Sequence, residues 1–134
     1  MQEIAWAIVR KRNRYLLIQR DLDDVSGGLW SFPGGKIKIS DHSPMYAAKR
    51  ELEEETHIMA HDLLELFQTT LDKYKISFFL CDKWEIDPSP GSQTIGVGWF
   101  TIPEIYNLDQ SLDPFLAKTL PLLAFTVRHD RFGK

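Results

Sequence analysis

Residues 27–58 read GGLWSFPGGKIKISDHSPMYAAKRELEEETHI, and this stretch decides how the chain folds. Its second half predicts a helix that begins at Pro44, after a capping Ser43, and runs to Thr56. Good helix formers dominate this segment, and neither glycine nor a second proline interrupts it. The sequence therefore predicts one secure helix with an irregular segment ahead of it.

The predicted helix carries three carboxylates on one face. Glu51, Glu54 and Glu55 stand at positions i, i+3 and i+4, so their side chains project within about one turn of each other. Like charges at this spacing destabilise a helix by a few tenths of a kcal/mol per pair. A divalent cation reverses the sign of that interaction, and Mg²⁺ prefers carboxylate oxygens. An acidic helix face alone is more often a solvated surface than a metal site.

The segment Pro33-Gly34-Gly35 supplies a second signal. Glycine lets the backbone approach a ligand closely, whereas the bland interpretation of this tripeptide is a tight turn. A glycine loop a few residues ahead of an acidic helix predicts a site that holds a metal and a phosphate together.

The elements on both sides predict a mixed α/β layered domain. Upstream, two apolar runs separated by a polar turn predict a β-hairpin over 4–10 and 15–20. Downstream, strands are expected over 63–71, 74–84 and 97–101. A short helix over 103–106 and a last helix that starts at 113–114 complete the order, and Pro121 is expected to kink the last helix or confine it to its start. We expect one domain over residues 1–134.

Composition excludes several classes of protein. The chain has 134 residues, of which 43% are hydrophobic and 26% are charged, as in globular domains rather than disordered or fibrous chains. No apolar run approaches the ~20 residues of a membrane helix. The net charge of −3 disfavours duplex nucleic acid as a partner. The lone Cys81 predicts a buried thiol in a reducing, cytoplasmic compartment.

The quoted stretch resembles the box of the Nudix hydrolase family. Gly35 supplies the first glycine of that box, and the run RELEEET at 50–56 supplies its core. One extra residue separates the two parts, so the first glutamate of the family becomes either Asp41 or His42. The final glycine of the box is His57 here.

The resemblance, of the MutT-like type, implies an α/β/α sandwich with a mixed sheet between helices. It also implies Mg²⁺ or Mn²⁺ held by Glu54, Glu55 and the carbonyl of Gly34. Glu51 would be a further metal ligand or the catalytic base, and Arg50 would orient the glutamates through an ion pair.

The same resemblance implies a small-molecule nucleotide substrate linked through a diphosphate. Nucleoside triphosphates cleaved to monophosphate and pyrophosphate are the first expectation. The expected substrate contacts come from Arg20, on phosphate, and from Phe32, Gly35 and Lys36. Some members carry a further carboxylate where this chain has Gln93.

Other interpretations stay open from the sequence. ADP-ribose, dinucleoside polyphosphates and nucleotide-sugars are alternative substrates, and a non-catalytic nucleotide-binding module is the alternative from another class. Family members commonly dimerise, so a homodimer is possible.

Overall fold

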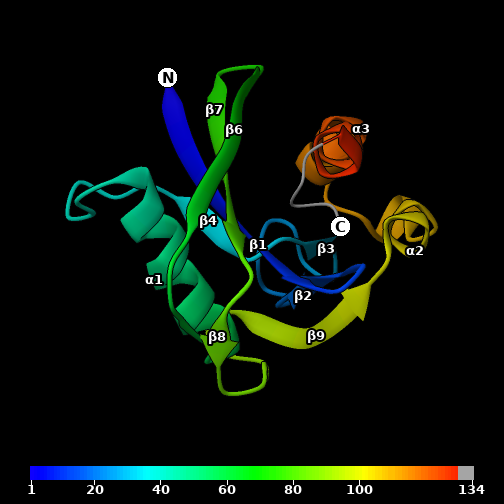
Figure 1. The fold of residues 1–134 in the computed structure, drawn as a ribbon, viewed down its shortest axis with the longest axis horizontal. Coiled ribbons are helices and arrows are strands. Elements are labelled where there is room, and N and C mark those ends of the chain that lie inside the picture. Colours follow the sequence, from blue (N-terminus) through cyan, green and yellow to red (C-terminus); the bar gives the residue numbers. More distant parts are fainter. Residues whose placement is uncertain (130–134) are drawn as a thin grey trace.

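The computed structural model describes residues 1–129, whose arrangement is shown in Figure 1. The strands are β1 (Gln2–Lys11), β2 (Arg14–Arg20), β3 (Trp30–Ser31), β4 (Gly34–Lys36), β5 (Met59–Ala60), β6 (Leu64–Leu71), β7 (Tyr74–Cys81), β8 (Trp84–Glu85) and β9 (Thr94–Phe100). The helices are α1 (Pro44–Thr56), α2 (Ile102–Tyr106) and α3 (Pro114–His129), with a 3₁₀ turn at Asp109–Ser111. The single domain expected over 1–134 stays a prediction, because residues 130–134 lie outside the described part of the chain.

Strand β1 runs through the middle of the main sheet. It pairs in parallel with β7, from Gln2 opposite Tyr74 to Val9 opposite Cys81. It also pairs antiparallel with β4 near its start and with β2 at its end, and β2 pairs antiparallel with β3 and β9. Parallel and antiparallel pairs occur together, so the sheet is mixed, as expected.

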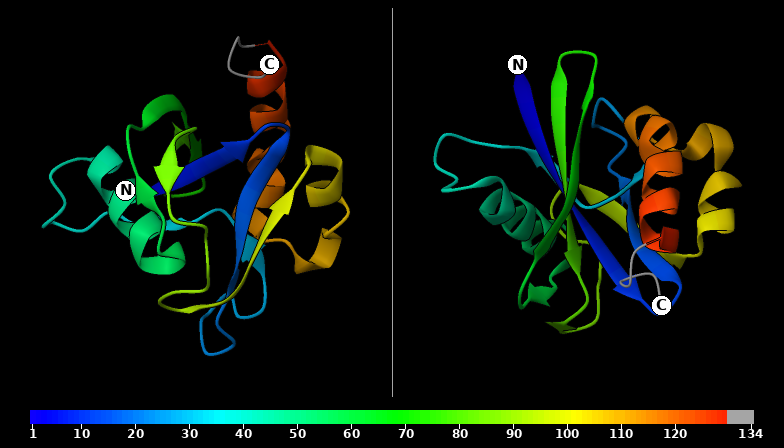
Figure 2. Two further views of the ribbon diagram at one scale, coloured as in Figure 1. Left: turned by 60° about the horizontal axis from the view of Figure 1, so that its bottom comes forward. Right: turned by 45° about the horizontal axis from the view of Figure 1, so that its top comes forward.

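Alternate residues of β1 enter two different cores, because successive side chains of a strand point to opposite faces. The core against α2 and α3 includes Ile4, Trp6, Ile8, Phe78, Ile105, Leu116, Leu120 and Leu123. The core against α1 includes Ala5, Ala7, Val9, Ala48, Leu52 and Phe79. Figures 1 and 2 show α1 on one side of the sheet and α2 and α3 on the other. The α/β/α sandwich is confirmed.

Helix α1 begins and ends as its sequence predicts. The Ser43 hydroxyl accepts a hydrogen bond from the amide of Tyr46 at 3.1 Å. At the other end, His57 adopts a left-handed conformation with φ of 64° and donates its N–H to the carbonyl of Glu53 at 3.0 Å. Both ends of the helix are thus fixed, and with them the direction of its acidic face.

Three expected boundaries are wrong. Strand β7 ends at Cys81, and Trp84 instead joins β8, which pairs with β5. Strand β9 starts at Thr94, three residues earlier than expected. Helix α3 continues past Pro121 to His129, because the fully buried Leu120 and Leu123 anchor it on both sides of the lost hydrogen bond.

The thiol of Cys81 is buried, as expected, and burial raises its pKa to about 11. Within residues 1–129, no helix combines the length and the apolar character needed to cross a membrane.

Candidate active site

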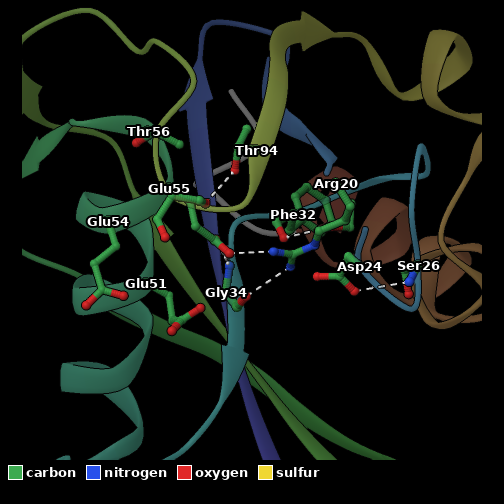
Figure 3. A network of polar contacts seen from close by, with 12 residues as sticks. Arg20, Asp24, Ser26, Phe32, Gly34, Glu51, Glu54, Glu55, Thr56 and Thr94 are labelled. Atoms are coloured by element: carbon green, nitrogen blue, oxygen red, sulfur yellow. Dashed lines mark hydrogen bonds and ion pairs between the residues drawn. The ribbon is translucent and has the colours of Figure 1, made fainter. Parts of the chain in front are cut away.

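The acidic face of α1 points toward strand β4, as Figure 3 shows. Burial of the three carboxylates increases toward the sheet: the Glu54 side chain is 50% exposed, Glu51 16% and Glu55 3%. The helix therefore presents one solvated carboxylate, one half-buried carboxylate and one that is enclosed by protein.

Glu55 is held by two partners. One carboxylate oxygen accepts the N–H of Gly34 at 2.9 Å, and the other forms an ion pair with Arg20. Burial raises the pKa of Glu55 to about 7, which the nearby Arg20 opposes and the nearby Glu51 reinforces. An enclosed carboxylate of this kind gains stability from any cation that reaches it.

Arg20 lies at the end of β2 with its side chain 13% exposed. Besides Glu55, its guanidinium donates to the carbonyl oxygen of Gly34 at 3.0 Å. Arg20 is therefore not a solvated arginine at a strand end: this cation bridges the helix and β4 (Figure 3).

Arg50 connects the loop before α1 to the acidic face. Its guanidinium donates to both oxygens of Asp41, at 2.8 and 3.0 Å, and to Glu51 at 2.6 Å and Glu54 at 3.3 Å. Asp41 raises the pKa of Arg50, and Arg50 lowers the pKa of Asp41 to about 2. Of the two candidates for the first acidic position of the box, Asp41 is therefore the one whose carboxylate contacts Arg50. The ring of His42 instead lies edge-on against Tyr46.

Two glycines of β4 allow close approaches, Gly34 to strand β1 and Gly35 to the acidic face of α1. At Gly34, where φ is 147°, a Cβ would lie 2.6 Å from the Trp6 side chain. At Gly35, a Cβ would lie 2.7 Å from a carboxylate oxygen of Glu51. The expected turn is instead a short strand paired with β1, and the missing side chain of Gly35 leaves room for the Glu51 carboxylate.

The acidic face opens into a cavity of about 560 Å³, within the size range of small-molecule sites. Residues predicted for the site that line this cavity are Arg20, Gly34, Gly35, Lys36, Glu51, Glu54 and Glu55. The wall therefore carries carboxylates of α1 as well as cationic side chains, a combination that suits a metal together with an anion.

One predicted contact is wrong. The ring of Phe32 is completely buried in the core, 5.9 Å from the ring of Trp6, and does not line the cavity. The aromatic side chain of Phe78 is likewise core.

The sequence did not predict several cavity residues: Asp24, Ser26 and Lys38, which follow predicted site residues along the chain, and Asp113 and Phe115, which come from a distant segment. Asp113 had a local signal, since Asp-Pro predicts a helix start. One of its oxygens does cap α3 by accepting the amides of Phe115 and Leu116, at 2.8 and 3.2 Å. Nothing local indicated that it also reaches the cavity.

The loop before β9 is fastened to the end of α1. Ser89, Gly91 and Ser92 donate their amides to the last carbonyls of the helix at 2.8 to 3.0 Å. This places Gln93 on the cavity wall. An amide takes no proton from water, so Gln93 itself does not serve as a base.

The donors at the site fit a hard divalent cation. Carboxylate oxygens of α1 and the Gly34 carbonyl form an all-oxygen set of the kind that Mg²⁺ and Mn²⁺ prefer. Arg20 already places a positive charge on two of these donors. Within residues 1–129, no three histidine, cysteine or acidic side chains converge as a ready metal site. The carboxylates are instead held by arginines.

Comparisons with known proteins agree with this geometry. The model of the NUDIX domain family matches residues 1–123. An 8-oxo-dGTP diphosphatase of Proteus vulgaris is 35% identical over 104 residues, covering 69% of this chain and 87% of that protein. A CTP pyrophosphohydrolase of Escherichia coli is 42% identical over 60 residues, covering 45% of this chain and 44% of that protein. The crystal structure of a MutT NUDIX hydrolase from Burkholderia pseudomallei has a TM-score of 0.75 at 23% identity, covering 90% of this chain and 95% of that one.

Proposed function

The chain belongs to the NUDIX family, and from this we propose that it hydrolyses nucleoside triphosphates to monophosphates and pyrophosphate with Mg²⁺ or Mn²⁺. Its likeness to an 8-oxo-dGTP diphosphatase and a CTP pyrophosphohydrolase supports a nucleoside triphosphate over ADP-ribose or a nucleotide-sugar. As a MutT-like member of the family, it is an enzyme that hydrolyses phosphoric anhydride bonds.

The observation that carries the proposal is the cavity itself. The carboxylates of α1, Gly34, Arg20 and Lys36 all line it, and Arg20 lies directly against Glu55 and the Gly34 carbonyl. A triphosphate with its bound cation carries both signs of charge and matches such a wall. An uncharged or purely cationic ligand would leave half of it without a partner.

The residues divide into three roles. Glu54, Glu55 and the Gly34 carbonyl hold the cation, which supplies charge neutralisation on phosphate and a lowered pKa of water. Glu51 is a further ligand or the base that accepts the proton of the attacking water. Arg50 contacts Glu51 and Glu54 and so fixes their direction.

Substrate contacts come from β2 and β4. Arg20 and Lys36 meet phosphate oxygens, and Gly35 lets the substrate approach the backbone. We expect a free nucleotide rather than duplex nucleic acid, because the net charge of the chain is −3. The cytoplasmic location and the homodimer stay predictions. Light scattering, which measures the molar mass in solution, tests the homodimer.

A phosphate-release assay tests the function. The purified protein is incubated with Mg²⁺ or Mn²⁺ and with dNTPs, oxidised dGTP, ADP-ribose, diadenosine polyphosphates or nucleotide-sugars. Triphosphate reactions are run with and without added inorganic pyrophosphatase. The other reactions are run with and without alkaline phosphatase, which frees phosphate from the monoesters that their cleavage would give. Phosphate that appears from triphosphates only when pyrophosphatase is added supports the proposal. Turnover of ADP-ribose or dinucleotides alone contradicts the substrate class. Nucleotide binding without any turnover identifies a binding module instead.

A further inference from the structure

Arg20 occupies two of the oxygen donors that the proposed function assigns to the cation. Its guanidinium is paired with Glu55 and donates to the carbonyl oxygen of Gly34 at 3.0 Å. Glu55 is enclosed, and its other oxygen is taken by the Gly34 amide. A metal ion and a guanidinium cannot both lie against the same carboxylate oxygen and the same carbonyl, because they repel and fill the same space.

We propose that Arg20 competes with the divalent cation for Glu55 and the Gly34 carbonyl, so that metal binding drives its guanidinium into the cavity. This inference rests on the proposed function, since it concerns the same cation. It assigns Arg20 a role beyond phosphate contact: it neutralises Glu55 until the metal arrives.

The displaced guanidinium has a place to go. Arg20 lines the cavity with Lys36 and Lys38, so its charge remains beside the region where phosphate is expected. The buried Asp113 lies on the same wall. Burial raises the pKa of Asp113, and its helix-capping hydrogen bonds and the charge of Arg20 oppose that rise.

Competition at Glu55 couples the two ligands of the site. A metal that displaces Arg20 frees a cation for phosphate, and phosphate that holds Arg20 away from Glu55 removes the competitor of the metal. By linkage the two effects are equal, so each ligand strengthens binding of the other. Arg20 thus favours binding of metal and polyphosphate together.

The test is the affinity for Mn²⁺ alone, measured by electron paramagnetic resonance of the free ion without nucleotide. Arg20→Gln removes the competing charge, and we expect it to bind Mn²⁺ about tenfold more tightly than the unchanged protein, in the range usual for coupled sites. The measurement is made near about pH 8.5, so that a proton does not replace the guanidinium on Glu55. Arg20→Lys keeps the charge and should return the affinity toward its original value.

Arg14→Gln is the matched control. Arg14 also pairs with a glutamate at 3.0 Å, but that pair with Glu104 is half exposed and does not line the cavity. This variant should bind Mn²⁺ as the unchanged protein does. The melting temperature gives a second readout: Mg²⁺ should raise that of Arg20→Gln by more than that of the unchanged protein, because the ion re-pairs Glu55.

The outcomes separate the two proposals. Tighter Mn²⁺ binding in Arg20→Gln, reversed in Arg20→Lys, supports competition. Equal or weaker binding in Arg20→Gln overturns it and leaves Arg20 as a residue that merely positions Glu55, with the hydrolase proposal intact. If Arg20→Gln does not fold, Arg20→Met removes the same charge, and Mn²⁺ binding by Arg20→Met no tighter than by the unchanged protein overturns competition. If none of the proteins binds Mn²⁺, both proposals fail.

Discussion

Two arginines neutralise the acidic face of α1, and they do so in different ways. Arg50 belongs to the helix and binds Asp41 through both carboxylate oxygens, as well as two glutamates of its own helix. Arg20 comes from β2, thirty-five residues before Glu55, and bridges that residue to a backbone carbonyl. One cation is tied to its own helix and the preceding loop, and the other joins separate elements at the edge of a cavity.

The two arginines differ in how firmly their surroundings hold them. Asp41, 1% exposed, also accepts the amide of Lys38 at 2.7 Å, so Arg50 is locked into a closed loop structure. Arg20 faces open space beside other cations. We infer that the Arg50 cluster maintains the fold of the site, whereas the Arg20 pair is the part that a ligand can rearrange.

The largest effect is expected for Glu54→Gln. Glu54 is the most exposed of the three carboxylates and touches Arg50 only at 3.3 Å, so the fold depends little on it. Loss of a metal ligand should lower kcat by roughly 10²–10³-fold. The melting temperature should hardly change. Steady-state kinetics and thermal unfolding check both.

Glu53→Gln is the control, because Glu53 lies on the same helix but does not line the cavity. Its kcat should equal that of the unchanged protein. A Glu54→Gln enzyme with full activity would remove Glu54 from the chemistry and leave Glu51 and Glu55 to hold the cation.

Arg50→Gln should come next, and its main effect should be on stability. The substitution leaves Asp41 and Glu51 without their cation in a mostly buried place, which should cost about 3 kcal/mol of unfolding free energy. Urea unfolding measures this. If Arg50→Gln loses no more unfolding free energy than Arg14→Gln, the fold does not depend on Arg50. The distinction between Arg50 and Arg20 would then be removed.

Asp41→Asn tests the same cluster from its other side, with an expected loss of about 1–3 kcal/mol at neutral pH. The folded pKa of Asp41, about 2, lies below its ordinary 3.8. Its contribution is therefore fully present above pH 3.8 and is lost as the pH falls through about 2. The stability difference between the two proteins should shrink over that window. A difference that stays constant in acid would mean that shape, not charge, binds Asp41 to Arg50.

Local signals in the sequence predicted the parts of the site that lie within one element. The capping Ser43 and the spacing of the glutamates follow from helix geometry, and the structure has the helix as expected. The strand at Gly34–Lys36 was missed because glycines favour turns, and here only pairing with β1 overrides that preference.

Contacts across the sandwich had no such signal. Asp113 begins a helix far from α1 in sequence, and only packing of α3 against the sheet brings it to the cavity. Phe32 was expected there because its neighbours in sequence are site residues. Its ring instead packs in the core against α2 and α3. Sequence spacing reports neighbours along one element, and a cavity is formed between elements.

The smallest effect concerns the end of α1 and tests whether helix stability alone disturbs the arginine clusters. His57 is exposed, with φ of 64°, a conformation that costs a non-glycine residue about 1–2 kcal/mol. Glycine removes that cost but gives the unfolded chain more freedom, worth about 0.5–1 kcal/mol. His57→Gly should therefore stabilise the protein by roughly 0.5 kcal/mol, measured by urea unfolding. His57→Ala keeps the Cβ and should not. Since His57 does not line the cavity, kcat should be unchanged in both variants. A fall in kcat with His57→Gly would contradict this. It would mean that the hydrogen bonds between the end of α1 and the loop at 89–92 position the carboxylates as strongly as Arg50 does.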